Sequence, residues 1–132
     1  MGFVGLPKRT RRQPLFMRRM LIVEDEQDLC ECLQTYFSSR GFAVTSAFSG
    51  EEAVARLDDA PADVILLDII LPGISGLEVL RHAKKRYPGA RIIIVTSQDR
   101  IEFRAEARLY GAAGYITKPF DFAESTWSPV FA

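Results

Sequence analysis

Acidic, hydroxyl and basic side chains stand at the ends of four short apolar stretches in this sequence. In chain order they are Glu24 and Asp25, then Asp68, then Thr96, then Lys118. Three carboxylates that share one crevice repel one another, which raises their pKa values unless a cation is present. Mg²⁺ suits a small open cluster of this kind, because it prefers one or two carboxylates together with water and phosphate oxygens.

A metal ion, an ammonium group and a hydroxyl group would together hold a phosphoryl group. The metal and Lys118 would neutralise its oxygens, Thr96 would donate a hydrogen bond, and a neighbouring aspartate would be the nucleophile. Asp68 is the best candidate nucleophile, since it ends the apolar run at the centre of the predicted sheet. Taken alone, Asp68 also fits a solvated acid at a strand end or a helix cap. The four strand ends taken together favour a site.

The polar residues need a fold that brings them to one place. Five short aliphatic stretches alternate with helical patterns, which predicts an α/β fold with a parallel sheet and helices on both faces. The expected strands are residues 20–23, 42–47, 63–68, 91–96 and 114–118. We predict a doubly wound sheet of order 2-1-3-4-5, because right-handed crossovers leave few alternatives. The carboxyl ends of such strands open on one edge, where ligands bind.

Capping signals predict where the helices begin. Ser49-Gly-Glu-Glu52 and Ser75-Gly-Leu-Glu78 are both capping boxes. An earlier helix is expected from about residue 27 to 40, before Gly41. Asp99 and Glu102 are expected to cap a further helix. Its inward side chains are expected to be Ile101, Phe103, Ala107 and Tyr110.

Length and charge limit the classes of protein to which this chain can belong. The 132 residues amount to one domain and carry no net charge. Residues 1–19 hold six of the seventeen basic residues and no acid, so residues 20–132 carry eleven basic and seventeen acidic residues, a net charge of −6. This balance predicts no direct nucleic-acid binding by the domain. No apolar run is long enough to cross a membrane, since Asp68 interrupts the longest one.

The two cysteines and the N-terminal segment give weaker indications. Cys30 and Cys32 fall on different faces of a predicted helix and are expected to be free thiols, which indicates a reducing compartment, the cytoplasm. Residues 1–19 are predicted to be a basic, flexible arm that precedes the domain at 20–132. This arm either contacts phosphate or an acidic surface, or is inert, or lies upstream of the natural start at Met17 or Met20.

Several motifs resemble those of response-regulator receiver domains of two-component signalling. They are LIVEDE with Glu24-Asp25, LLDIILPGISGLEVL around Asp68, VTS with Thr96, and GYITKPF with Lys118, and the resemblance is strongest over residues 20–120. It implies that Asp68 accepts a phosphoryl group from a phosphohistidine on a sensor kinase or phosphotransfer protein. By the same resemblance, the protein ligands of Mg²⁺ would be Asp25, Asp68 and the backbone carbonyl of Ile70, with Glu24 acting through water.

The resemblance also implies a switch. Lys118 would bridge to the phosphoryl oxygen, Thr96 would move toward it, and Tyr115 would swing inward behind Thr96 and change the surface of the fourth helix and fifth strand. The Lys118–Pro119 bond is expected to be cis, which X-Pro bonds tolerate. The chain would then be a signalling protein that assists its own phosphorylation and dephosphorylation, and no enzyme acting on a separate substrate.

Other interpretations stay open at this point. A pseudo-receiver would bind a partner without phosphorylation, although none of the required acids nor Lys118 is missing. A hydrolase with an aspartate nucleophile would need a covering lid, and no insertion is long enough for one. Tyr115 also fits a core aromatic, Glu24 a solvated acid, and His82 a surface residue.

The C-terminal segment departs from the family, which normally closes with a long fifth helix. Asp121 and Glu124 form a capping-box pattern, but Pro129 is expected to stop the helix, leaving about two turns near residues 122–127. The sequence therefore predicts a shortened fifth helix. It also predicts a partly uncovered sheet face unless the tail folds back or a second copy covers it, and hence a homodimer through the C-terminal region.

Overall fold

Five parallel strands form the sheet in the computed structural model, which describes residues 17–132. The strands are β1 (Arg19–Val23), β2 (Ala43–Ala47), β3 (Val64–Leu67), β4 (Arg91–Thr96) and β5 (Gly114–Thr117). Their order is β2-β1-β3-β4-β5, so the predicted topology is confirmed. Residues 1–16, which are most of the predicted basic arm, lie outside the described residues.

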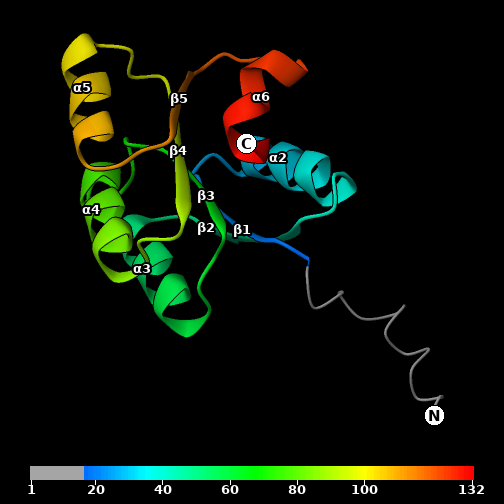
Figure 1. The fold of residues 1–132 in the computed structure, drawn as a ribbon, viewed down its shortest axis with the longest axis horizontal. Helices are drawn as coiled ribbons and strands as arrows, with labels where there is room; N and C mark the ends of the chain where they lie inside the picture. Colours follow the sequence, from blue (N-terminus) through cyan, green and yellow to red (C-terminus); the bar gives the residue numbers. More distant parts are fainter. Residues whose placement is uncertain (1–16) are drawn as a thin grey trace.

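Helices cover both faces of the sheet (Figure 1). They are α2 (Gln27–Ser39), α3 (Gly50–Asp59), α4 (Gly76–Arg86), α5 (Ile101–Leu109) and α6 (Glu124–Phe131). Helices α3, α4 and α5 lie on one face, and α2 and α6 on the other. The crossover from each strand to the next parallel strand therefore places its helix on a face where it buries one apolar side.

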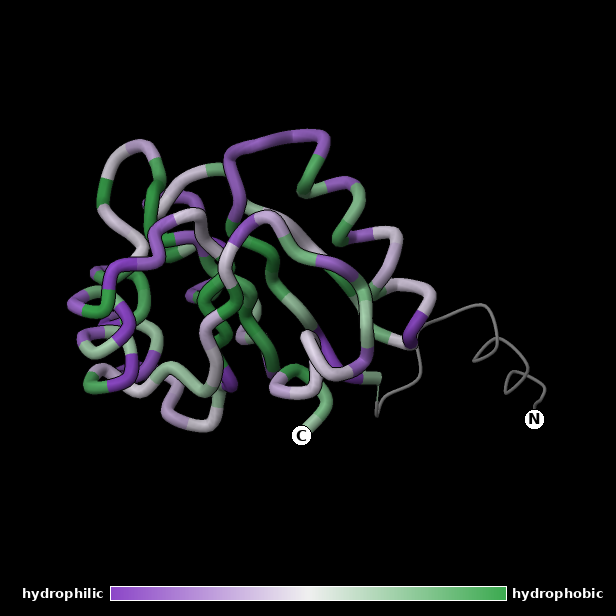
Figure 2. The backbone as a smooth tube through the Cα atoms, turned by 90° about the horizontal axis from the view of Figure 1, so that it is seen from above, coloured by the Kyte–Doolittle hydropathy of each residue, from purple (hydrophilic) through white to green (hydrophobic). Residues whose placement is uncertain are grey.

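The central strand β3 is aliphatic throughout because it is covered on both faces. All four of its residues are buried, and side chains alternate between the two apolar layers. Figure 2 shows the hydrophobic strands at the middle of the molecule and helices in which hydrophilic and hydrophobic residues alternate. The strand ends leave this core together, which is why polar residues can follow them.

Two of the three predicted helix caps in the middle of the chain are confirmed. The Ser49 hydroxyl accepts a hydrogen bond from the Glu52 amide at 3.1 Å, and the Ser75 hydroxyl accepts one from Glu78 at 3.3 Å. The Glu52 carboxylate also accepts from the amide of Phe48, the residue before the cap.

The predicted start of α5 is wrong. The helix begins at Ile101 after Arg100, no side chain caps it, and the Gln98 side chain accepts from the Arg100 amide instead. Ile101 was expected to pack inward, but it is 77% exposed. The first turn lies at the outer edge of the sheet, so only the side facing β5 and α4 is covered. Ala107 is buried and Phe103 and Tyr110 are half-buried.

The C-terminal helix is short, as predicted, but its position differs. It begins at Glu124, not near 122, and Asp121 accepts hydrogen bonds from the Ala123 amide and the Thr126 hydroxyl without acting as the cap residue. Pro129 lies inside the helix. A proline removes the amide that would donate to the carbonyl four residues earlier. The hydroxyl of Ser128 donates to that carbonyl, on Ser125, so the helix continues to Phe131.

The expectation of an uncovered sheet face is also wrong. Trp127 and Val130 are fully buried against the side of the sheet that α2 covers. The Trp127 ring contacts Phe37 and Phe120 edge-on, with centroids 5.3 and 5.0 Å apart, and its indole N–H donates to the Asp121 carbonyl. The tail folds back over the face, so the reason for expecting a homodimer disappears.

Two smaller expectations can be compared with the structure. Cys30 is buried, Cys32 is exposed, and both are free thiols, as predicted. Among residues 17–132, no helix is both long and apolar enough to cross a membrane.

Candidate functional site

The predicted polar residues meet at the carboxyl edge of the sheet. Glu24 and Asp68, which follow β1 and β3, are buried, while Asp25 is exposed. Each of these three carboxylates offers an oxygen, and the three oxygens lie within 4.8 Å of one another. Thr96 ends β4 and is buried, and Lys118 follows β5. One acidic crevice therefore combines residues from four strands.

Lys118 is the cation of this crevice. Its ammonium nitrogen lies 2.8 Å from an Asp68 oxygen and 2.8 Å from a Glu24 oxygen, and 3.9 Å from Glu26. Burial, the largest single influence, lowers the pKa of Lys118, but the hydrogen bonds and charges of Asp68 and Glu24 together raise it above its ordinary value. Lys118 is therefore charged at neutral pH and neutralises part of the buried acid.

Burial makes Glu24 harder to ionise. It raises the pKa of the Glu24 carboxyl above the ordinary value of 4.5, although Lys118 and the Glu26 amide, which donates at 3.0 Å, act against the rise. Asp68 is oriented by the backbone, since one of its oxygens accepts from the Ile70 amide at 2.9 Å and the other from Lys118. Both carboxylates are thus held in fixed positions.

A chain of contacts leads from Thr96 toward the surface. The Gln98 amide donates to the Thr96 hydroxyl at 3.3 Å, and the Tyr115 hydroxyl donates to the Gln98 carbonyl at 2.5 Å. The guanidinium carbon of Arg104 lies 4.6 Å from the centre of the Tyr115 ring. Burial raises the pKa of Tyr115. In this arrangement the Tyr115 ring is half-buried and lies between the crevice and α5.

The donor set fits a hard divalent cation. Carboxylate oxygens from Glu24, Asp25 and Asp68 are the ligands that Mg²⁺ and Ca²⁺ prefer, and the exposure of Asp25 leaves one side of the cluster open to water. A cation here would reduce the repulsion among three carboxylates that Lys118 only partly offsets.

The turn after β5 adopts the expected backbone conformation. The Lys118–Pro119 peptide bond is cis, and the Lys118 amide donates to the Thr96 carbonyl at 2.8 Å. This hydrogen bond joins the end of β5 to the end of β4.

Some residues near the site gave no usable signal in the sequence. Glu26 belongs to the acidic triplet, but nothing in its position indicated that it would approach Lys118. Arg104 lies on α5, and no local pattern predicted its contact with Tyr115.

His82, expected at the surface, is half-buried between helices, with its Nε2 atom 3.6 Å from Asp58 and away from the crevice.

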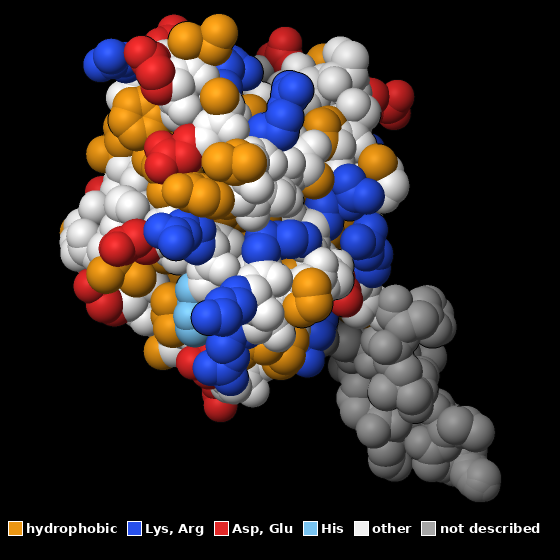
Figure 3. Space-filling model, turned by 60° about the vertical axis from the view of Figure 1, so that its left-hand side comes forward, with side chains coloured by type: hydrophobic (Ala, Val, Ile, Leu, Met, Phe, Trp, Pro, Cys, Tyr) orange, Lys and Arg blue, Asp and Glu red, His pale blue; other side chains and the backbone are white. Residues whose placement is uncertain are grey.

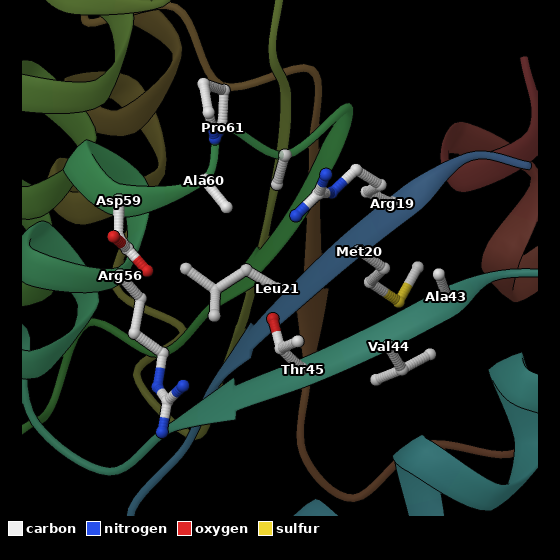
Figure 4. Close-up of a pocket in the computed structure, with 11 residues that line it drawn as sticks. Arg19, Met20, Leu21, Ala43, Val44, Thr45, Arg56, Asp59, Ala60 and Pro61 are labelled. Atoms are coloured by element: carbon white, nitrogen blue, oxygen red, sulfur yellow. The ribbon is translucent and has the colours of Figure 1, made fainter. Parts of the chain in front are cut away.

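A separate hollow of about 320 Å³ lies at the opposite edge of the sheet, beside the first residues of β1 and β2 and the end of α3 (Figure 4). Its charged residues are Arg19, Arg56 and Asp59. Arg56 pairs with Glu52 of its own helix at 3.2 Å. The hollow lacks the combination of carboxylates, hydroxyl and ammonium found at the carboxyl edge, so the carboxyl edge is the candidate site.

Comparisons with known proteins agree with this geometry. A model of the response regulator receiver domain matches residues 20–126. The chain is 37% identical over 105 residues to the uncharacterized transcriptional regulatory protein YkoG of Bacillus subtilis, covering 80% of this chain and 46% of YkoG. It is 35% identical over 104 residues to the response regulator SaeR of Staphylococcus aureus, covering 79% and 45% of the two chains. The chain thus spans less than half the length of these curated relatives.

Two solved structures illustrate the similarity of fold, and the second of them holds ligands. A CheY-like receiver domain protein from Methanospirillum hungatei has a TM-score of 0.77 and 30% identity, with 80% of this chain and 84% of that chain covered. A response regulator from Burkholderia pseudomallei has a TM-score of 0.75 and 27% identity, with 79% and 61% covered. The latter structure contains a phosphorylated aspartic acid, a calcium ion and citrate.

Proposed function

The chain belongs to the response regulator receiver domain family, and from this membership we propose that it is the phosphoacceptor of a two-component phosphorelay, with Asp68 as the acceptor. The observation that carries the proposal is the contact of Lys118 with both Asp68 and Glu24 at 2.8 Å, inside a cluster of three carboxylates. A buried carboxylate held beside an ammonium group is suited to receive a phosphoryl group, and Thr96 at the end of the neighbouring strand could donate a hydrogen bond to it.

In the proposed transfer, an Asp68 carboxylate oxygen attacks the phosphorus of a phosphohistidine. The new oxygen–phosphorus bond forms as the nitrogen–phosphorus bond breaks, and the imidazole leaves with the bonding electron pair. Lys118 neutralises charge on the phosphoryl oxygens, and the Ile70 amide keeps the carboxylate in position. The donor would be a sensor histidine kinase or a histidine phosphotransfer protein.

Mg²⁺ is the proposed cofactor, and when bound it would supply positive charge to the phosphoryl oxygens. Asp25 and Asp68 would be direct ligands with the backbone carbonyl of Ile70, and Glu24 would act through water. The proximity of the carboxylate oxygens supports this assignment. The calcium ion in the structure of the Burkholderia regulator is a feature of that relative, and it is in keeping with a hard cation here.

The proposed output is a change at α5 and β5. Thr96 would turn its hydroxyl toward the phosphoryl group and lose its contact with the Gln98 amide. Tyr115, whose hydroxyl donates to the Gln98 carbonyl in this state, would then move into the space behind Thr96. Arg104 lies over the Tyr115 ring, so α5 would sense the movement.

The test is the intact mass of the protein after incubation with Mg²⁺ and acetyl phosphate, a small phosphodonor. We expect one added phosphoryl group on the wild-type protein, and none on Asp68→Asn or after chelation of Mg²⁺. Asp63→Asn is a matched control, because Asp63 precedes the same strand at the opposite edge of the sheet and should leave labelling unchanged.

Labelling of Asp68→Asn to the wild-type extent would place the acceptor elsewhere and reject the assignment. A wild-type protein that takes up no phosphoryl group from acetyl phosphate or from a purified phosphohistidine donor would favour a phosphorylation-independent interaction module.

A further inference from the structure

The connection from β3 to α4 carries both Asp68 and the carbonyl of Ile70, the proposed third protein ligand of Mg²⁺. Hydrogen bonds fix its two ends. The Asp68 amide donates to β1 at 3.1 Å, and the amide of Gly76, the first residue of α4, donates back to the Ile69 carbonyl at 2.9 Å. Between these ends the chain is more exposed, and the Ile70 side chain is 54% exposed. The position of the Ile70 carbonyl therefore depends on what holds residues 71–75.

Glu51, in the first turn of α3, contacts this connection from a different element. Its Oε2 atom accepts a hydrogen bond from the Ile74 amide at 3.1 Å. Within residues 17–132, this is the only hydrogen bond that joins residues 71–75 to an element other than α4. The middle of the connection is therefore bound to α3 through one carboxylate.

Two glycines allow α3 and the connection to approach so closely. Gly73 has a φ of 76°, in the left-handed region that favours glycine, and a Cβ atom there would overlap the Glu51 carboxylate. Gly50 is buried, and a Cβ atom on it would lie 2.6 Å from the Ile74 carbonyl oxygen. Side chains are thus absent at the two positions where they would separate Glu51 from Ile74.

Glu51 pairs with no basic side chain of residues 17–132. Figure 3 shows Lys and Arg side chains gathered on the side that α4 and α5 form, but none of them forms an ion pair with this carboxylate. The next residue differs, because Glu52 accepts from the Phe48 amide and pairs with Arg56 of its own helix at 3.2 Å. Glu52 therefore stabilises its own helix, whereas Glu51 contacts the connection that follows the phosphoacceptor.

Glu51 does not belong to the acidic cluster itself. The three carboxylates whose oxygens lie within 4.8 Å of one another are Glu24, Asp25 and Asp68. An effect of Glu51 on a bound cation would therefore act through the backbone of the connection or through its charge. An acid in the first turn of a helix also stabilises that helix, which is the simpler role. The hydrogen bond to a second element indicates a role beyond the helix.

We propose that Glu51 is a positioning residue for Mg²⁺, which holds the β3–α4 connection, and with it the Ile70 carbonyl, in the arrangement that receives the cation. This inference rests on the proposed function. The apparent affinity of a site falls with the fraction of molecules in the binding-competent arrangement, and the hydrogen bond from Ile74 raises that fraction in the free protein. A bond of this kind at the surface changes an equilibrium constant about three- to tenfold, and we expect an effect of that size on Mg²⁺ affinity.

The test is a calorimetric titration of the full chain with Mg²⁺ alone. We expect Glu51→Ala to bind Mg²⁺ about three- to tenfold more weakly than the wild type. Glu51→Gln keeps an oxygen that can accept from the Ile74 amide, and it should bind within about twofold of the wild type. Glu52→Ala is the matched control, since it removes the same charge from the same turn of α3 but leaves the contact with Ile74 in place.

Two further measurements separate positioning from general damage to the fold. Hydrogen–deuterium exchange of the metal-free protein should be faster over residues 71–75 in Glu51→Ala and unchanged in Glu51→Gln. In labelling with acetyl phosphate, the Mg²⁺ concentration that gives half the maximal rate should rise in Glu51→Ala by the same factor as the dissociation constant. The rate at saturating Mg²⁺ should change by less than about twofold, whereas a damaged fold would lower that rate as well.

Equal Mg²⁺ affinity of Glu51→Ala and the wild type would overturn the role of Glu51 and leave the phosphoacceptor assignment intact. Equal weakening by Glu51→Gln would mean that the charge acts on the cation and the hydrogen bond does not. Equal weakening by Glu52→Ala would mean that any acid in this turn has the effect, and either result rejects the positioning role. A wild-type protein that shows the expected dependence of Mg²⁺ affinity on Glu51 but takes up no phosphoryl group would support the positioning role and reject the phosphoacceptor.

Discussion

Lys118 holds two buried carboxylates at the same distance, so its charge stabilises the fold as well as the proposed phosphoryl group. Lys118→Met keeps the apolar stem but leaves Glu24 and Asp68 without a cation. Removing one member of a buried ion pair costs about 3 to 5 kcal/mol, and we expect about 3 kcal/mol at neutral pH because the Lys118 side chain is 16% exposed. Urea unfolding measures this loss, and Lys85→Met, on the exposed side of α4, serves as the control.

The loss of stability in Lys118→Met should become smaller as the pH falls from neutral. The pKa of Glu24 is raised in the folded protein, chiefly by burial, above its ordinary value of 4.5. As the pH falls through that raised pKa, the folded state takes up a proton before the unfolded state does, so folding is favoured relative to neutral pH. Lys118 lowers the pKa of Glu24, so in Lys118→Met that pKa is raised further and the variant gains more stability on protonation than the wild type does. The deficit of Lys118→Met should therefore shrink between neutral pH and about 4.5. A deficit that grows over this range would contradict the account.

Ile70 is expected to control how long the phosphoryl group persists. Its side chain is exposed beside the crevice, two residues after Asp68, and cannot hydrogen-bond an attacking water. Ile70→Asn supplies a donor and an acceptor there and should speed dephosphorylation, about tenfold or more if it positions the water. The decay of labelled protein measures the rate. Ile70→Val is the control, and equal decay of the Asn and Val variants would show that a polar group at this position has no effect.

Residue types and strand ends were sufficient to predict which side chains would meet. Glu24, Asp25, Asp68 and Lys118 lie together, and Thr96 ends the neighbouring strand β4, because parallel topology brings the carboxyl ends of strands to one edge. Their hydrogen bonds were not predictable, since the contact of Lys118 with two acids depends on side-chain positions that the order of the strands does not determine. Arg104 was missed for the same reason: its contact with Tyr115 joins two elements that share no sequence pattern.

At the scale of elements, a capping pattern stabilises a helix only where the side-chain oxygen accepts a hydrogen bond from an amide in the first turn of that helix. Ser49 accepts from the Glu52 amide, and Ser49→Ala should lower the free energy of unfolding by about 1 kcal/mol. Asp99 fits the same pattern but makes no capping bond, so Asp99→Ala should change it by less than about 0.5 kcal/mol. Thermal or urea unfolding of the two variants decides the matter, and equal losses would contradict the structure.

The elements themselves were predicted well where periodicity was strong and less well where the environment decided. Strand β3 is recognisable in the sequence because it is apolar along its whole length. Ser49 and Ser75 are the N-cap residues of α3 and α4, whose buried residues recur with helical spacing. The burial of Ile101 was predicted wrongly because its helix lies at the edge of the sheet, where no further element covers an apolar residue in the first turn. Pro129 was misjudged because the Ser128 hydroxyl replaces the missing backbone donor.

At the scale of the whole molecule, the two faces of the sheet are closed in different ways. Three helices cover one face, whereas α2 shares the other with the eight-residue α6. The short helix suffices because its aromatic side chains are large and are joined by Phe120 and Phe122 from the preceding turn. Closure of this face therefore depends heavily on one residue, Trp127.

Trp127→Ala should open the face that α6 covers. Truncation of a fully buried tryptophan costs about 3 to 5 kcal/mol, which is a large share of the ~5 to 15 kcal/mol of a typical domain. Phe131→Ala, at a side chain 45% exposed on the same helix, should cost much less. Sedimentation should show a wild-type monomer at every concentration and concentration-dependent association of Trp127→Ala, since the exposed apolar face of one copy can cover that of another. A wild-type protein that dimerises at low concentration, or a Trp127→Ala protein as stable as wild type, would mean that α6 does not close this face.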